Sequence, residues 1–322
     1  MLTKLFVALL VVFAAVVLVA LVCFLFVFFV PRIKKYDPEA IPLPQGETYR
    51  PYHELMKQWV LEGRSMPYRD FYIKSFDGLT LHARYYEYQK GAVTEIMFHG
   101  YRGTAERDLS GGLQRCFALG RNVLLVDQRT TCKSGGHVIT FGIREHRDCL
   151  SWVEFATQQF GSEVPLVLTG ISMGASTVLM AAGKPLPPNV KGVLADCGFT
   201  TAEAIIKKCS KDLHLPANLL YPFVKLGAKL FGGFDLEEYS ALEGVKNSTL
   251  PIIFVHNDGD GFVPFEMSKE LYAAANGPKC FVEISGNGHG LSYLLDNQKY
   301  FEHVTQFFTR NGLPTKLLSK IL

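Results

Sequence analysis

The chain has 322 residues, of which 48% are hydrophobic and 20% are charged, and its formal net charge is +3. It contains no long basic run and no basic stretch interleaved with aromatic residues, so nucleic acid is not expected as a partner. The apolar content is sufficient for one large globular core in addition to a membrane segment.

The N-terminal region is predicted to be a membrane anchor. Residues 5–30 form a run without a charged side chain. At about 1.5 Å per residue this run spans about 39 Å as a helix, against a hydrocarbon core of about 30 Å. Arg32, Lys34 and Lys35 follow it. We therefore expect residues 1–35 to form a single-pass anchor with a basic flank.

A cleavable signal peptide is the competing interpretation of this region. Such a peptide has an apolar region of about 7–15 residues followed by a small-x-small site, whereas this run is longer and ends in FLFVFFV. A lipoprotein signal at Cys23 is disfavoured because Val22, before it, is not small. The basic residues after the run favour a cytoplasmic location for the rest of the chain by a small margin. The reverse topology stays open.

Beyond the anchor, residues 36–67 are predicted to be a linker and residues 68–322 a single domain. The linker is rich in proline and tyrosine, with a short helical stretch near His53–Glu62. In the domain, Asp77-Gly78 separates two strand-like runs, which is typical of a hairpin turn.

The rest of the domain alternates between apolar strand-like runs and helical runs. This alternation indicates an α/β fold with a mostly parallel sheet flanked by helices. The connection from Asp196 to Pro251 is too long for a plain crossover, so we expect a small helical lid at about residues 199–248. The expected strands are 95–99, 122–127, 165–170, 191–196, 251–256 and 280–285, and helices are expected at 143–159, 173–183 and 265–276.

Residues 170–174 read G-I-S-M-G and fit the pattern G-x-S-x-G. An apolar strand-like run precedes this pattern and a helical run follows it, the context in which the serine lies on a sharp strand-to-helix turn. The residues two before and two after the serine must be small so that strand and helix can approach. Ser172 is therefore the candidate nucleophile.

A serine hydroxyl needs a base to remove its proton, and that base is expected after the last strand. His289 lies in the glycine-rich run G-N-G-H-G between that strand and the C-terminal helix. We expect it to be the base. Its rivals are His256, at the end of a strand, and His214 and His303, on helical surfaces.

The base needs a carboxylate that fixes its tautomer, and three aspartates compete for this role. Asp260 is favoured by the chain order Ser, Asp, His. Asp258 in the same loop and Asp196 at the end of an earlier strand remain alternatives. The aspartates that lose this competition are expected to be turn or packing residues.

Two backbone N–H groups are candidates for an oxyanion hole. The loop H-G-Y-R-G follows the first buried strand, and its glycine lets the N–H of Tyr101 point at a developing oxyanion. The N–H of Met173, directly after the nucleophile, supplies the second donor. His99 in the same loop is expected to be structural.

Taken together, the segments HGYRGT, NVLLVDQR, LTGISMGAS, GVLADCGF, DGFVP and GNGHGLSY resemble the α/β-hydrolase superfamily over roughly residues 70–310. Within it, the chain looks like membrane-anchored bacterial hydrolases of the serine aminopeptidase-like branch. The resemblance implies that Asp260, in D-x-x-V-P, is the triad acid. Two departures from that pattern, at residues 130–132 and 256–257, are expected to affect the shape of the pocket.

The expected function is hydrolysis of an ester, such as a lipid or another acyl ester, through a Ser-His-Asp triad and an acyl-enzyme. A peptidase or amidase of aminopeptidase-like type is the alternative, and a non-catalytic membrane-bound binding protein is a third hypothesis. No metal or organic cofactor is needed. The seven cysteines include no C-x-x-C pair and are expected to be reduced thiols.

Overall fold

The computed structural model describes residues 1–31 and 39–313, so the predicted basic flank of Arg32, Lys34 and Lys35 lies outside the described residues. A single sheet forms the centre of the domain. Its strands are β1 (Arg69–Lys74), β2 (Thr80–Tyr86), β3 (Thr94–Phe98), β4 (Asn122–Asp127), β5 (Leu166–Ile171), β6 (Val190–Asp196), β7 (Ile252–Gly259) and β8 (Lys279–Asn287). They lie in the order β1-β2-β4-β3-β5-β6-β7-β8.

The sheet is parallel from β4 through β8, and β2 runs antiparallel to both of its neighbours, β1 and β4. In register, Ile96 of β3 lies between Leu124 of β4 and Leu168 of β5, and all three side chains are fully buried. The expected mostly parallel sheet is confirmed. The hairpin between β1 and β2 is also confirmed, with Gly78 in the left-handed region at φ +84°.

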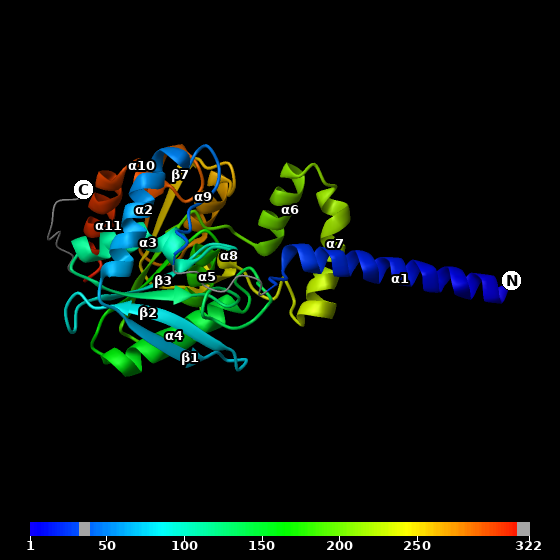
Figure 1. Cartoon of the computed structure of the whole chain (residues 1–322), viewed down its shortest axis with the longest axis horizontal. Helices are drawn as coiled ribbons and strands as arrows, with labels where there is room; N and C mark the ends of the chain where they lie inside the picture. The colour runs from blue at the N-terminus through cyan, green and yellow to red at the C-terminus, as the bar shows by residue number, and fades with distance from the viewer. Residues whose placement is uncertain (32–38, 314–322) are drawn as a thin grey trace.

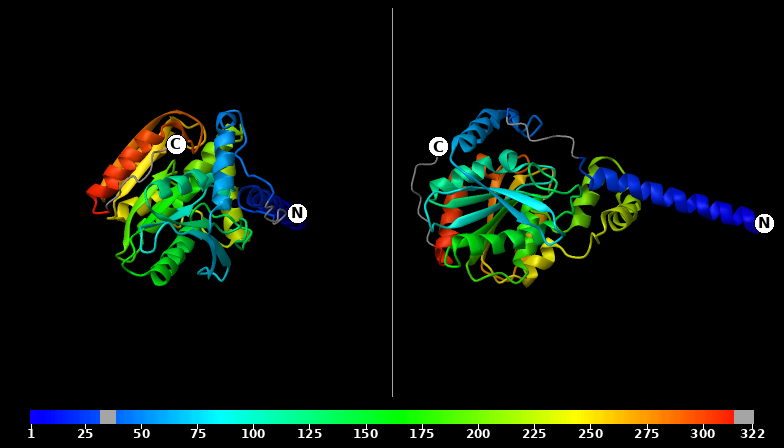
Figure 2. Two further views of the ribbon diagram at one scale, coloured as in Figure 1. Left: turned by 60° about the vertical axis from the view of Figure 1, so that its left-hand side comes forward. Right: turned by 60° about the horizontal axis from the view of Figure 1, so that its bottom comes forward.

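Helices cover both faces of this sheet (Figure 2). One face packs against α4 (Glu145–Phe160), α5 (Met173–Ala182), α8 (Ala241–Asn247) and α9 (Phe265–Ala274). The other face packs against α3 (Ala105–Ala118) and α11 (Asn297–Arg310). Alternate strand residues serve the two faces, as a sheet buried on both sides requires. α2 (His53–Ser65), within the predicted linker, packs on α3, and the short α10 (Ser292–Leu295) precedes α11.

The long connection after β6 is helical, as expected. It contains α6 (Ala202–Asp212), α7 (Ala217–Gly227), a π-helical turn η2 (Ala228–Gly232) and α8. Because α8 packs on α5, the last part of the predicted lid belongs to the helical layer on the sheet. The part that projects from the domain is α6, α7 and η2, which lie beside the N-terminal helix in Figure 1.

The N-terminal helix α1 (Leu2–Val27) is the one helix of the described residues that is long and apolar enough to cross a membrane. Most of it extends away from the domain (Figure 1). Its C-terminal end is built into the main core, where Phe28 is fully buried and contacts the rings of Phe141 and Phe234. The backbone continues this attachment, since Val30 N–H donates to the carbonyl of His137.

Candidate active site

Ser172 lies on a sharp turn between β5 and α5, with φ +56° and ψ −121°. The turn brings strand and helix so close that a Cβ added at Gly170 would lie 2.2 Å from the backbone of Gly174. A Cβ added at Gly174 would lie 2.0 Å from the carbonyl oxygen of Phe98. The expected requirement for small residues on both sides of the serine therefore follows directly from the backbone.

His289 lies between Ser172 and Asp260. Its Nε2 is 2.8 Å from Ser172 Oγ and its Nδ1 is 2.7 Å from Asp260 Oδ2. The serine is nearly buried, the Asp260 side chain is fully buried, and the His289 side chain is 18% exposed. With the proton on Nδ1, the ring donates to the carboxylate and accepts from the hydroxyl, which is the arrangement that general-base catalysis requires.

Asp260 is surrounded by hydrogen-bond donors. Its Oδ1 accepts from the backbone N–H groups of Phe262 (2.8 Å) and Val263 (3.1 Å). Burial by itself raises the pKa of this carboxyl. Hydrogen bonds from His256, His289 and the backbone outweigh burial and hold the pKa of Asp260 well below its usual range. The group is therefore an anion at neutral pH, as a partner for an imidazolium should be.

A second histidine contacts the same carboxylate. The ring of His256 is fully buried, with Nε2 3.0 Å from Asp260 Oδ2 and Nδ1 2.8 Å from Ser268 Oγ. In the sequence, His256 was a rival for the base at a strand end. In the structure its two ring nitrogens contact Asp260 and Ser268, and it is His289 that contacts Ser172. At residues 256–257, His256 matches the family pattern and contacts Asp260, whereas the departure is Asn257, which binds the loop that carries His289.

The two competing aspartates lie elsewhere. Asp258 accepts a hydrogen bond from the backbone N–H of Gly286 at 2.9 Å, the turn role expected for an aspartate that is not the acid. Asp196 accepts from Ser292 Oγ at 2.8 Å, and burial raises its pKa to about 6. Its side chain contacts the start of α10, directly after the loop that carries His289.

The loop that carries His289 is held from both sides. Asn257 Nδ2 donates to the carbonyl oxygens of Gly286 (3.0 Å) and Gly288 (2.7 Å). Tyr49 donates its phenol proton to the carbonyl oxygen of His289 at 2.9 Å. Burial raises the pKa of Tyr49 to about 12, so this phenol remains a donor over the physiological range.

The loop after β3 approaches the serine from the opposite side. A Cβ added at Gly100 would lie 3.4 Å from Ser172 Cβ, at van der Waals distance, so this loop borders the serine directly. Asp108 Oδ2 accepts from the N–H of Gly100 at 2.9 Å and fixes the loop. In residues 1–31 and 39–313, no protein acceptor is found for the N–H groups of Tyr101 and Met173, which leaves both available to a ligand.

The same loop is attached to the end of α1. The hydroxyl of Tyr101 donates to the carbonyl oxygen of Val27 at 2.6 Å. Arg102 Nη2 donates to the carbonyl oxygens of Phe26 (2.8 Å) and Phe29 (3.2 Å). Carbonyl groups at a helix C-terminus have no intrahelical partners, so these side chains cap the membrane-spanning candidate.

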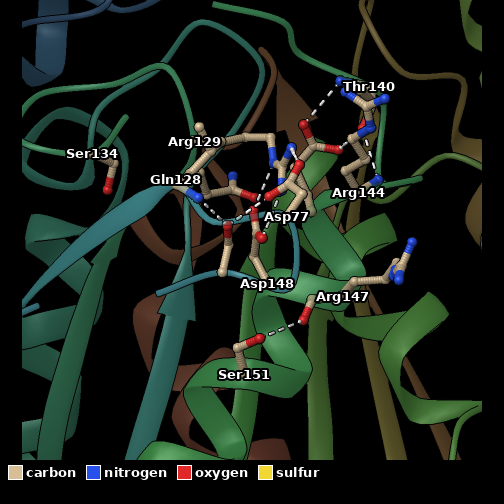
Figure 3. Close-up of polar contacts among 12 residues, drawn as sticks. Asp77, Gln128, Arg129, Ser134, Thr140, Arg144, Arg147, Asp148 and Ser151 are labelled. Atoms are coloured by element: carbon tan, nitrogen blue, oxygen red, sulfur yellow. Dashed lines mark hydrogen bonds and ion pairs between the residues drawn. The ribbon is translucent and has the colours of Figure 1, made fainter. Parts of the chain in front are cut away.

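His99 has the structural role expected from the sequence. Its buried Nε2 accepts from the N–H of Gln128 at 3.1 Å, and the side chain of Gln128 donates to the His99 carbonyl. Burial lowers the pKa of His99 and keeps the ring neutral. The adjoining Arg129 is paired with Asp148 at 2.7 Å and Asp77 at 3.1 Å, as Figure 3 shows.

A cavity of about 360 Å³ opens at Ser172. Its walls are largely apolar, and Arg115, Asp196 and Tyr300 lie at its buried end. The predicted linker contributes part of the wall, with Pro44, Gln45, Tyr49, Met56 and Trp59. Among the described lining residues, none comes from 199–248. The segment before β1 therefore forms part of the pocket wall, because α2 packs on α3 beside the serine.

Cys197, Asp260 and His289 offer three potential metal-ligand atoms within 4.8 Å of one another. A metal there would compete with the hydrogen bond between the aspartate and the imidazole. Burial raises the pKa of the Cys197 thiol well above its usual range, so it remains protonated and is a poor ligand. The donor set therefore fits a proton relay better than a metal centre.

Comparison with known proteins agrees with this geometry. Residues 96–239 match the family model described as alpha/beta hydrolase fold. The chain is 24% identical to protein Rv2307c of Mycobacterium tuberculosis over 93% of this chain and 95% of that protein. It is 29% identical to YqkD of Bacillus subtilis over 59% of this chain, and the match spans 62% of YqkD, less than two thirds of its length.

A solved structure with a similar backbone is the Pyrococcus furiosus esterase Pf2001. Its TM-score is 0.63 at 22% identity, and the alignment covers 86% of this chain and 98% of the esterase. The chain has the α/β-hydrolase fold. The family match and the likeness in backbone to this esterase both support that fold.

Within this α/β-hydrolase fold, the sequence brought Ser172, His289 and Asp260 into consideration, and the structure brings their side chains together. The contributions of His256 and Tyr49 were missed. His256 had a local signal, because it lies four residues before Asp260 on the same strand end. Tyr49 had none, because it is more than 200 residues from the histidine whose carbonyl it binds.

Proposed function

We propose that this protein is a membrane-anchored serine hydrolase that cleaves an acyl ester. Ser172 is the nucleophile, His289 the base and Asp260 the acid that orients the base. The observation that carries the proposal is the unbroken hydrogen-bond path from Ser172 Oγ through both ring nitrogens of His289 to Asp260. The strained backbone at Ser172 supports it as well, because such strain is concentrated at functional sites.

The chemistry follows from this path. Ser172 Oγ attacks the ester carbonyl while its proton passes to Nε2 of His289. The carbonyl oxygen becomes an oxyanion, which accepts hydrogen bonds from the N–H groups of Tyr101 and Met173. The imidazolium then protonates the departing alcohol and leaves an acyl-serine. Water attacks this ester with His289 again as base, and the acid is released.

The cavity supports an ester with an apolar acyl or alcohol part. Pockets bind ligands through a mainly apolar wall with few polar groups. The aromatic and aliphatic walls here include Trp59, Met97, Leu109 and Leu194, and they lead away from Ser172. A polar aminoacyl group would be poorly matched to this wall, so an ester is favoured over the peptidase alternative.

The anchor is proposed to be retained in the mature protein. Cleavage near residue 30 would remove Phe24 and Phe28, which fill the main core of the domain. The chain is then organised as anchor, pocket-lining segment and hydrolase domain. The basic flank and the cysteines favour a domain on the cytoplasmic side by a small margin.

The test measures the hydrolysis of acyl esters of graded chain length and, in parallel, of aminoacyl amides. The enzyme is the full-length chain purified in detergent. We expect turnover of esters, with kcat/KM rising with acyl length until the cavity is filled. Ser172→Ala is the matched control and should be inactive. Preferential cleavage of amides would instead establish the peptidase function, and no turnover of either class would reject the enzyme.

A further inference from the structure

The N-terminal helix crosses α7 at a point of very close contact. Ala20 of α1 is fully buried, and a Cβ added at Gly227 of α7 would lie 2.4 Å from its carbonyl oxygen. The same Cβ would lie 3.1 Å from Phe24 Cβ. Small residues thus allow close contact between the two backbones. They also fix the position along the axis of α1 at which α7 crosses it.

That height coincides with the edge of a bilayer. Residues 2–19, which precede the crossing, rise about 27 Å along the helix axis. A hydrocarbon core is about 30 Å thick, so it extends from the start of α1 to about the level of α7. Tilting α1 would bring α7 deeper still.

The orientation of α7 also fits a membrane surface. In Figure 1 α7 runs across the axis of α1, and the turned views of Figure 2 agree. A membrane-spanning helix is tilted by only about 20° from the bilayer normal on average. A helix that crosses it therefore lies close to the plane of the membrane.

The face of α7 that points away from the domain is apolar. The residues that face the domain are Ala217, Tyr221 and Val224 of α7, followed by Ala228 of η2. The opposite stripe, at helical spacing, consists of Leu219, Phe223 and Leu226 of α7 and continues to Leu230 of η2. Leu219 is 66% exposed and Leu230 is 54% exposed, and the adjoining loop and turn expose Leu213, Leu215 and Phe231. A cluster of exposed apolar side chains of this kind marks an interaction surface.

We propose that this surface, formed by Leu213, Leu215, Leu219, Leu230 and Phe231, is embedded in the headgroup–acyl boundary of a phospholipid bilayer. The occupant is a bilayer because the surface adjoins α1 at the depth where the hydrocarbon ends. Helix α7 then acts as an interfacial helix and α1 as a spanning one. The proposal rests on the anchor in the proposed function, and it makes the projecting part of the lid a second membrane contact.

The test uses the full-length chain in phospholipid vesicles and tryptophans introduced one at a time. Leu219→Trp and Leu230→Trp report on the proposed surface, and Val12→Trp reports on the middle of α1. Tyr88→Trp is the matched control, since Tyr88 is 41% exposed and follows β2 at the end of the sheet opposite the active site. Trp59 and Trp152 are buried, and their fluorescence in the unaltered chain gives the background.

Vesicles with brominated acyl chains quench tryptophans in contact with lipid. We expect bromine near the headgroup end to quench Leu219→Trp and Leu230→Trp most, and bromine near the methyl end to quench Val12→Trp most. Tyr88→Trp should match the background. If Val12→Trp is quenched but neither Leu219→Trp nor Leu230→Trp is, the proposed interfacial surface is rejected and the membrane anchor is retained. No quenching of Val12→Trp would overturn both, whereas ester hydrolysis is measured independently of either.

Discussion

His256 Nε2 lies 3.0 Å from Asp260 Oδ2, the same carboxylate oxygen that accepts from His289. The carboxylate is therefore shared by two imidazole rings, of which only one faces the serine. His256 is fully buried and is fixed on its other side by Ser268 Oγ at 2.8 Å. We infer that His256 is a positioning residue that holds Asp260 in the orientation that His289 requires.

His256→Phe should lower kcat by about 10- to 100-fold, because a buried carboxylate loses one donor worth about 1.5–3 kcal/mol. KM should change little, since the ring does not line the cavity. The pKa of Asp260 should rise towards its usual range, because the anion loses one hydrogen-bond donor. His256→Gln, which can still donate, should recover part of kcat. Equal losses of kcat in both variants would mean that His256 only fills space.

Ser172→Ala should abolish covalent labelling by a fluorophosphonate probe and reduce turnover by about 10⁴-fold or more. The fold should be unaffected, because the hydroxyl is lost without a change in the turn. Labelling is read by intact-protein mass spectrometry. Label that persists in the variant would assign the nucleophile to another residue.

Asp260→Asn should reduce turnover by up to about 10⁴-fold, because an amide favours the wrong tautomer of His289. Asp258→Asn is the matched control in the same loop. Its effect on turnover should be far smaller, because Asp258 only accepts a hydrogen bond from the N–H of Gly286. The two variants are compared by kcat at equal melting temperature. Near-normal turnover in Asp260→Asn with collapse in Asp258→Asn would move the acid to Asp258.

Asp196→Asn should change how stability depends on pH. Burial raises the pKa of Asp196 from 3.8 to about 6, so between these values the folded chain keeps a proton that the unfolded chain has released. The stabilisation from this group is complete below about pH 4 and is lost as pH rises to about 6. The asparagine variant lacks that loss, so its melting temperature relative to the native chain should increase over this window. Parallel curves for the two proteins would refute the assignment.

The sequence was sufficient for the strands of the parallel sheet, and it singled out three residues whose side chains the structure brings together. Each of these carries its signal within a few neighbouring residues, as Ser172 does between a strand and a helix. The pocket could not be predicted in this way. Tyr49 and Trp59 reach it from a segment that looks like a linker, because only packing on α3 brings that segment to the serine.

The attachment of α1 was unpredictable for the same reason. An uninterrupted apolar run has no pattern that separates lipid-facing residues from those that enter the core. Phe28 enters the core, whereas Phe26 is 66% exposed. The two phenylalanines have similar apolar neighbours in the sequence, so the sequence does not distinguish them. The distinction is made by Phe141 and Phe234, far along the chain.

The burial of Phe28 has a consequence for the order of events during synthesis. The helix leaves the ribosome first, whereas the rings that enclose Phe28 belong to residues 141 and 234. The core around Phe28 therefore cannot close until residue 234 has been synthesised. The first helix of the chain thus joins the domain late in folding, after most of the sheet has been made.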